Sequence, residues 1–277
     1  MKNKTNGIKK QFFMLLLLVI GFVCIKFYES YKLRNDTNTK PVIGAVESSN
    51  EDLESFKYLS DLAKDNQKIA TVMKNKEDYP KIMLEMLSRN LDMTDYVLGY
   101  PKKKGNLYSK TIGEVEQGKY PLLLQYDSRW GYGIYGDEVI AINGCGPTSL
   151  AMILAGLTGK NNVTPYDISL YAYNNGYYEN GTSWSFFTNG VKKYGIVGTE
   201  ISLSKSTMID ELEQGHPIIC SMRKGDFTTT GHIIAITGIS DGKFIINDPA
   251  SVERSNKLWS YEKIKGQIKN LWSFRIA

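Results

Sequence analysis

The spacing of apolar residues divides the chain into an apolar N-terminal run, a helical stretch and a strand-rich end. Residues 12–25 carry no charge. From Glu51 to about Val97 the apolar residues recur at helical spacing, which predicts about three amphipathic helices, with Pro80 opening one of them. Between these two stretches, residues 32–48 are polar and lack periodicity, as expected of a linker.

A second block of elements follows residue 120. The apolar-rich run at 149–157 predicts a helix, and a shorter helix is expected near residues 184–194. The apolar runs at 217–222 and 232–238 predict buried strands. Helices followed by strands indicate an α+β fold, in which a helical part packs against an antiparallel sheet.

These patterns divide the chain into five parts. They are a signal anchor or signal peptide at 1–31, a linker at 32–48, a helical extension at 49–100, a second linker at 101–119 and a main domain at 120–277. A chain of 277 residues with 42% hydrophobic residues can bury one sizeable core and carry appendages.

The basic charge is concentrated at the N-terminus. The net charge is +5, and Lys2, Lys4, Lys9 and Lys10 supply four of these charges. Because no basic stripe remains elsewhere to neutralise a row of phosphates, nucleic-acid binding is not expected.

These lysines and the apolar run behind them are typical of a membrane-targeting segment. No small-x-small cleavage site follows the run, which favours an uncleaved anchor with Lys26, Phe27 and Tyr28 at the membrane interface. Cleavage stays open as an alternative, whereas the bulky residues before Cys24 disfavour lipidation there. In either case we expect the rest of the chain outside the cytoplasmic membrane, anchored to it or secreted.

The three cysteines and two histidines restrict the possible chemistry. Their spacing matches no structural zinc pattern, so neither a metal nor another cofactor is expected. Cys220 lies in a predicted buried strand, and a disulfide between Cys145 and Cys220 is disfavoured.

Cys145 is the first candidate for a catalytic residue. It lies two residues before Pro147, which suits the first position of a helix, so the thiol is expected at a helix N-terminus. Unpaired N–H groups and the positive end of the helix dipole stabilise a thiolate there. The alternative is a small buried hydrophobic residue at a helix cap.

A cysteine hydrolase also needs a base, and His232, at the start of an apolar strand, is the better of the two histidines. His216 lies in a turn, where a structural role is expected. Asp248, which precedes Pro249, can accept the second imidazole N–H and orient the ring.

The turn between the two strands decides whether His232 and Asp248 can meet. With a two-residue turn at 241–242, Asp248 would lie opposite Ala235 and on the other face from His232. A three-residue turn would place Asp248 opposite Ile234, on the same face. We therefore predict the three-residue turn, and a two-residue turn without a compensating bulge would count against Asp248.

Gln125, twenty residues before Cys145, is a candidate for a second oxyanion donor beside the backbone N–H of Cys145. Taken alone it is an ordinary surface glutamine. Its neighbours Asp127, Arg129 and Trp130 are expected to brace its loop.

Five motifs follow one another along residues 120–277: Gln-Tyr-Asp-x-Arg-Trp-Gly at 125–131, Gly-Cys-Gly-Pro-Thr-Ser at 144–149, Gly-Thr-Ser-Trp at 181–184, Gly-x-Phe-Thr at 225–228 with Gly-His at 231–232, and Asn-Asp-Pro at 247–249 with Ser251. Together they resemble the peptidase C39-like family, papain-like cysteine peptidases related to the bacteriocin-leader (double-glycine) peptidases. The resemblance is to the stand-alone, exported form from Gram-positive bacteria.

This resemblance implies a papain-like cysteine peptidase fold for residues 120–277. It assigns Gln125 as oxyanion donor, Cys145 as nucleophile, His232 as base and Asp248 as orienting group. The helical extension also looks like the N-terminal extension of the stand-alone form.

The predicted function is therefore hydrolysis of peptide or amide bonds in a peptide or protein substrate by a monomer outside the membrane. A cell-wall peptide amidase using the same site and a tethered peptide-binding module without turnover stay open as alternatives. Five aromatic residues either line a cleft beside the nucleophile or pack loops: Tyr171, Tyr173, Tyr177, Tyr178 and Trp184.

Overall fold

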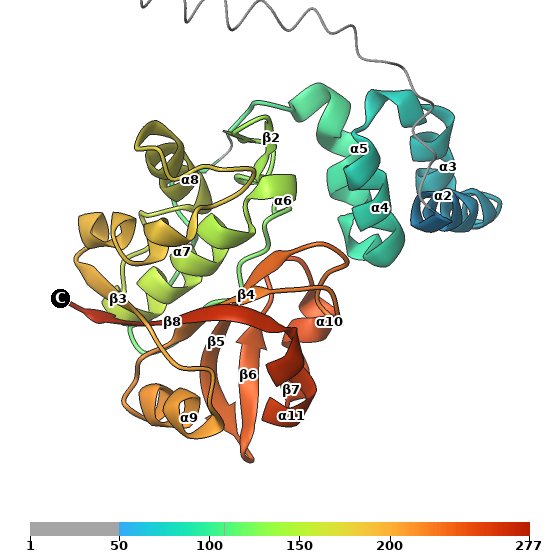
Figure 1. Ribbon diagram of the computed structural model, residues 1–277. Coiled ribbons are helices and arrows are strands. Elements are labelled where there is room, and N and C mark those ends of the chain that lie inside the picture. Colours follow the sequence, from blue (N-terminus) through green and yellow to red (C-terminus); the bar gives the residue numbers. More distant parts are fainter. Residues whose placement is uncertain (1–49, 108) are drawn as a thin grey trace, which may run out of the picture. The chain divides into compact units, whose positions relative to one another are not determined.

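The computed structural model describes residues 50–107 and 109–277. The predicted anchor at 1–31 and the linker at 32–48 lie outside the described residues. Within the described ranges, no helix is both long and apolar enough to cross a membrane. Residues 50–277 belong to one structural unit, which Figure 1 shows from α2 to β8.

Helices come first in the described chain. They are α2 (Asn50–Leu62), α3 (Gln67–Lys74), α4 (Lys81–Arg89) and α5 (Thr94–Lys103), with short 3-10 turns η1 (Lys76–Asp78) and η2 (Leu91–Met93) between them. Pro80 caps the N-terminus of α4, as predicted. Helix α5 runs past the expected end near Val97 and includes Pro101, because a proline close to the helix end removes only one backbone hydrogen bond.

These helices share a hydrophobic core with the segment that follows them. Buried residues of α2–α5 cluster with Tyr126, Tyr132, Val139 and Ala141. Tyr132 stacks on Tyr96 with ring centroids 4.3 Å apart, and its hydroxyl donates to the Tyr96 carbonyl at 2.8 Å. The helices therefore pack directly on the main domain.

The main domain is built on a six-stranded antiparallel sheet. Its strand order is β3 (Ile196–Glu200), β8 (Ile268–Ile276), β4 (Ile218–Met222), β5 (His232–Ser240), β6 (Lys243–Asn247) and β7 (Leu258–Trp259). A separate two-stranded ribbon pairs β1 (Ile134–Tyr135) with β2 (Glu138–Val139). The two predicted buried strands correspond to β4 and β5, and the predicted α+β class is confirmed.

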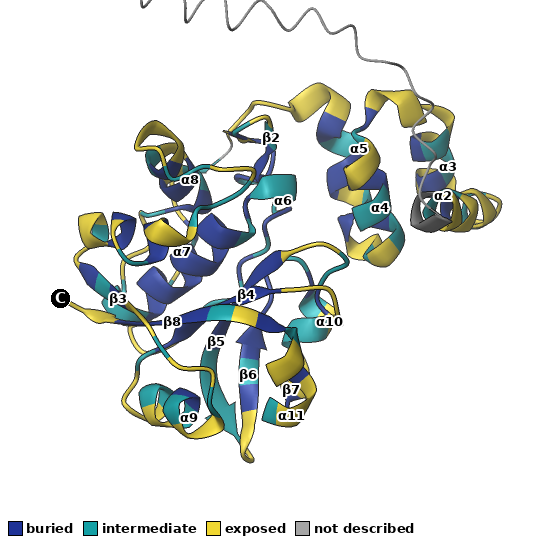
Figure 2. Ribbon diagram, viewed as in Figure 1, coloured by how far each residue is buried: buried dark blue, intermediate teal, exposed yellow. Residues whose placement is uncertain are grey.

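Helices cover both faces of this sheet, since successive strand residues point to opposite sides. Ile219, Ile233 and Ala235 pack in the cluster that contains α7 (Cys145–Thr158) and α8 (Pro165–Asn174). Ile218 and Cys220 point the other way, into the cluster of α9 (Lys205–Glu213) and α11 (Tyr261–Ile264). Figure 2 shows α7 buried along most of its length, which makes it the central helix of the domain.

Two local expectations differ from the structure. The helix expected near residues 184–194 is a pair of 3-10 helices, η3 (Trp184–Phe187) and η4 (Gly190–Tyr194). The end of the chain, expected to be rich in strands, also contains α9, whose N-terminus is capped by the Ser204 hydroxyl.

The turn of the β5–β6 hairpin is shorter than predicted. It has two residues, Asp241 and Gly242, with φ values of 52° and 68°, as in a type I′ turn. The register then shifts at a bulge around Thr237, between Ile236 and Gly238. Gly238 stands directly after the extra residue, and a glycine inside a strand often marks a bulge.

This bulge has the effect that the three-residue turn was expected to have. Beyond it Ala235 pairs with Asn247, so the next residue, Asp248, continues on the side where His232 lies. The prediction of the turn was wrong, but the bulge compensates for it.

Candidate active site

The nucleophile candidate sits at the start of the central helix. Helix α7 begins at Cys145, two residues earlier than Pro147 predicts, and Gly144 is its N-cap. A side chain at Gly144 would collide with Ile140, because an added Cβ would lie 2.5 Å from the Ile140 carbonyl oxygen. The half-buried Cys145 thiol therefore lies among the unpaired N–H groups of the first helical turn.

Ser149 holds this helix against the strand that carries the histidine. It lies one turn after Cys145, is fully buried, and its hydroxyl donates to the Ile233 carbonyl at 3.2 Å. A buried serine in an otherwise apolar helix was the sequence signal for this contact, which fixes α7 relative to β5 beside His232.

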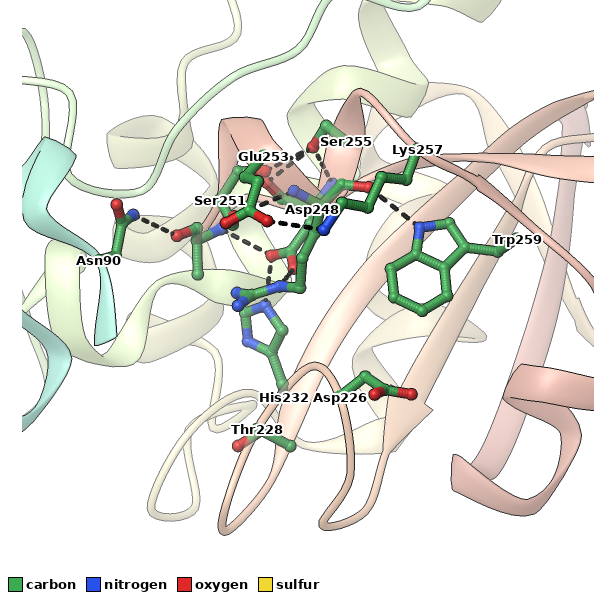
Figure 3. A network of polar contacts seen from close by, with 12 residues as sticks. Asn90, Asp226, Thr228, His232, Asp248, Ser251, Glu253, Ser255, Lys257 and Trp259 are labelled. Carbon is green, nitrogen blue, oxygen red and sulfur yellow. Dashed lines mark hydrogen bonds and ion pairs between the residues drawn. The ribbon is translucent and has the colours of Figure 1, made fainter. Parts of the chain in front are cut away.

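The structure brings His232 and Asp248 together. His232 Nε2 lies 2.8 Å from Asp248 Oδ1, and both side chains are buried (Figure 3). This contact leaves Nδ1 as the ring nitrogen available to the Cys145 thiol, which lines the same cleft as His232. The histidine thus connects the buried carboxylate to the thiol.

The Asp248 carboxylate is fully buried and has several donors. Oδ1 also accepts the Ala250 N–H at 2.8 Å, and Oδ2 accepts Arg254 Nε at 2.5 Å. Burial by itself would raise the pKa of Asp248, but the charges and hydrogen bonds of His232 and Arg254 hold it below the usual range. The carboxyl group is therefore a charged acceptor for the imidazole.

Arg254 is the site residue that sequence reasoning missed. It lies on the short helix α10 (Val252–Ser255), whose N-cap is Ser251. In sequence it is one charged residue in a polar stretch, which reads as a solvated surface. Only the fold shows that its guanidinium lies against the buried Asp248 carboxylate.

The pKa of His232 is shifted in the opposite sense to that of Asp248. Burial lowers the pKa of an imidazole, but here the charge of Asp248 and the hydrogen bonds with Asp248 and Cys145 outweigh burial and raise the pKa of His232 to about 9. The site therefore favours the imidazolium form at neutral pH.

Gln125 is buried, unlike an ordinary surface glutamine. Its backbone N–H donates to the Pro249 carbonyl at 2.8 Å, which ties it to the segment that carries Asp248. Its side-chain Nε2 donates to the Ala141 carbonyl at 2.6 Å, while the Ile142 carbonyl lies 3.5 Å away, at the limit of a hydrogen bond. One of the two N–H groups of the Gln125 side-chain amide therefore makes only a weak hydrogen bond.

The residues that follow Gln125 brace its loop. Arg129 pairs with Asp127 at 2.7 Å and lies over the Trp130 ring, whose indole N–H donates to the Leu124 carbonyl at 2.9 Å. An added Cβ at Gly131 would lie 2.8 Å from the backbone carbonyls of Asp127 and Gln125. The motif at 125–131 thus maintains a tight loop.

A cleft of about 350 Å³ opens at these residues. Gln125, Cys145 and His232 line it together with the loop at 225–231 and Arg254. Helix α4, its C-cap Asn90 and the η2 turn contribute five further lining residues: Ile82, Met86, Arg89, Asn90 and Met93.

The five aromatic residues expected either at the cleft or in loop packing are absent from this lining, as far as the structure describes it. Tyr171, Tyr177 and Tyr178 pack against the core, and Trp184 makes an edge contact with Trp272 at 5.7 Å. Packing is therefore the observed role of these four, whereas Tyr173 is 54% exposed and contacts only the rim of this packing, through the ring of Tyr178 at 5.8 Å.

The remaining titratable candidates lie apart from this arrangement. His216 pairs with Glu211 at 2.8 Å. Cys220 is a free thiol whose burial raises its pKa above the ordinary value, and Cys145 is also free. Among the described residues, no group of three or more His, Cys, Asp and Glu side chains is placed to hold a metal ion.

One known family matches the main domain. The sequence profile of the Peptidase_C39 like family matches residues 117–274. The chain is similar to the peptidase domain of Streptococcus ComA, a bi-functional ABC transporter involved in a quorum sensing pathway, with 23% identity over 57% of this chain and 98% of that one and a TM-score of 0.40.

A second similar structure is a double glycine motif protease from an AMS/PCAT transporter, solved in complex with the leader peptide. It is 18% identical, the match covers 60% of this chain and 99% of that one, and the TM-score is 0.39. No curated protein sequence matches the chain.

Proposed function

Because this chain belongs to the Peptidase_C39 like family, we propose that it is a cysteine peptidase with Cys145 as nucleophile, His232 as acid and base, and Asp248 as the orienting group. The observation that carries the proposal is the position of the buried His232 ring. Its Nε2 lies 2.8 Å from Asp248 Oδ1, and the ring lines the same cleft as the Cys145 thiol. A protein that only binds peptides has no chemical need for these three groups together.

The proposed reaction is acyl transfer through a thioester. The Cys145 thiolate attacks the carbonyl carbon of the scissile amide, and the oxyanion accepts hydrogen bonds from the Cys145 N–H and the Gln125 amide. The imidazolium of His232 then protonates the leaving amine as the C–N bond breaks. Next, neutral His232 takes a proton from water, whose oxygen hydrolyses the thioester and restores the thiol.

We place this activity outside the cytoplasmic membrane, on a peptide or protein substrate. The basic segment and apolar run within residues 1–31 support an anchored or secreted enzyme. The leader peptide bound to the similar double glycine motif protease supports a peptide as substrate. A monomer is sufficient, because a single chain supplies all four proposed site residues.

Thiol alkylation of the full chain tests the proposal directly. We expect iodoacetamide to label Cys145 much faster than the buried Cys220, with the adducts located by mass spectrometry. Replacement of His232 by alanine should slow labelling of Cys145, since the thiolate loses its cationic partner. The matched Cys220→Ala variant should label Cys145 at the wild-type rate. Slow labelling that does not depend on His232 would favour the binding module.

Replacement of Gln125 by alanine is expected to lower peptide hydrolysis by about 10²-fold, because one oxyanion donor is lost. Alkylation of Cys145 by iodoacetamide forms no oxyanion, so its rate should stay close to that of the wild type. This pair of assays separates transition-state stabilisation from folding. An equal loss in both assays would show that Gln125 only supports the loop.

The imidazole of His232 is expected to titrate near pH 9. Because the pKa of His232 in the folded state lies above the ordinary value of about 6.5, its contribution to stability is complete below pH 6.5. That contribution is lost as the pH rises through 9. NMR titration of the histidine ring protons, assigned with His216→Gln, measures this directly, and a His232 midpoint at or below 6.5 would contradict it.

A further inference from the structure

Helix α4 carries apolar side chains on two of its sides. Met83, Leu84 and Leu87 are buried in the core of the N-terminal helices. Ile82 and Met86, four residues apart and therefore on one side of the helix, line the cleft that contains Cys145. Packing of the helix explains the first set, and Met86 is half-buried against the same core, while Ile82 remains 37% exposed.

The apolar end of the cleft is continuous with the site. Met93, from the turn after α4, lies in the same lining although only 1% of it is exposed, and Ile142, three residues before Cys145, lies there too. The loop at 225–231 contributes glycines and threonines, which offer backbone and hydroxyl groups, together with Asp226 and the buried Phe227. This distribution suits an extended peptide, with one apolar side chain against α4 and its backbone along the loop.

Helix α4 is bonded to both loops that frame the cleft. Arg89 donates to the Thr229 hydroxyl at 2.8 Å. The Asn90 side chain donates to the Ala250 carbonyl at 2.8 Å, and the N–H of Ala250 in turn donates to Asp248 (Figure 3). The helix is therefore a fixed wall of the cleft, joined through one residue to the catalytic carboxylate.

We propose that the N-terminal helices form a specificity subsite, in which an apolar side chain of the peptide substrate binds against Ile82, Met86 and Met93. The subsite sets the position of the substrate relative to Cys145. This inference rests on the proposed peptidase function, because it assigns the bound molecule as the substrate of that site.

Peptide capture tests the subsite without requiring catalysis. The full chain carrying Cys145→Ala is immobilised, incubated with a synthetic library of random peptides, and the retained peptides are sequenced by mass spectrometry. We expect enrichment of leucine, isoleucine, methionine or phenylalanine at one position. In the Ile82→Glu background this enrichment should fall roughly tenfold or more, the scale of an apolar pocket contact.

Two further variants serve as controls. Leu53→Glu makes the same kind of change at an exposed leucine of α2 outside the cleft lining, and should keep the enrichment. Met86→Gln keeps the length of the side chain and should reduce the enrichment, which guards against misfolding of any one variant. An unchanged profile in both Ile82→Glu and Met86→Gln, or no apolar preference in the parent protein, would overturn the subsite.

Incubation of the same library with the chain that retains Cys145 separates the two proposals. Retention of apolar peptides without cleavage would refute the peptidase function while supporting the subsite. Cleavage without an apolar preference, or with one that does not depend on Ile82, would support the peptidase and refute the subsite.

Discussion

Replacement of Cys145 by alanine is expected to reduce peptide hydrolysis by about 10⁴-fold or more, because no other group can form the thioester. His232 and Asp248 should keep their contact, since neither depends on the sulfur for its position along the sheet. The measurement is the rate of product formation from a peptide that the wild-type chain cleaves, with thermal unfolding recorded for each protein.

Cys220→Ala is the matched control for this substitution. It removes the other thiol of the described unit, which points into the cluster on the opposite face of the sheet, and hydrolysis should stay within a few-fold of the wild type. Residual hydrolysis by Cys145→Ala within tenfold of the wild type would exclude Cys145 as the nucleophile.

Replacement of Arg254 by methionine is expected to lower the free energy of unfolding by about 3 kcal/mol, the largest single effect on stability among the substitutions considered. Asp248 is fully buried, and loss of the guanidinium would remove one of the two cationic partners of its carboxylate. Breaking a buried ion pair from one side has a cost of this size. Urea unfolding at neutral pH measures it.

Lys257→Met is a control on the same short stretch of chain. Lys257 pairs with Glu253 at 2.6 Å, but both side chains are more than half exposed, so the change should cost less than about 1 kcal/mol. Hydrolysis should fall for Arg254→Met and not for Lys257→Met, because only Arg254 touches the residue that orients His232. Equal effects of the two substitutions would contradict this role of Arg254.

The parts of the site that the sequence predicts are those with local signals. A glycine and a proline frame Cys145 at a helix start, and His232 opens an apolar strand, so both elements could be predicted from spacing alone. The β5–β6 register could not be predicted, because a glycine inside a strand, here Gly238, permits a bulge but does not require one. The two-residue turn alone would have argued against Asp248, which the structure nevertheless places on His232.

Long-range contacts account for the rest of what the sequence did not predict. Arg254 reaches Asp248 through the short helix α10, and the Gln125 N–H donates to the Pro249 carbonyl, in the segment that follows Asp248. The contact between Asn90 and Ala250 joins residues 160 positions apart. No periodicity or motif encodes such pairs, so the helical extension could be predicted as helices but not as a wall of the cleft.

The strand order also constrains how the chain acquires its structure. The last strand, β8, lies between β3 and β4, so β3 joins the sheet only through residues at the far end of the sequence. The β4–β5–β6 ribbon can form from neighbouring segments, but the remaining pairing must close a long loop first. We therefore expect slow, late completion of the sheet, so that β3 gains protection from hydrogen exchange only when the final strand is in place.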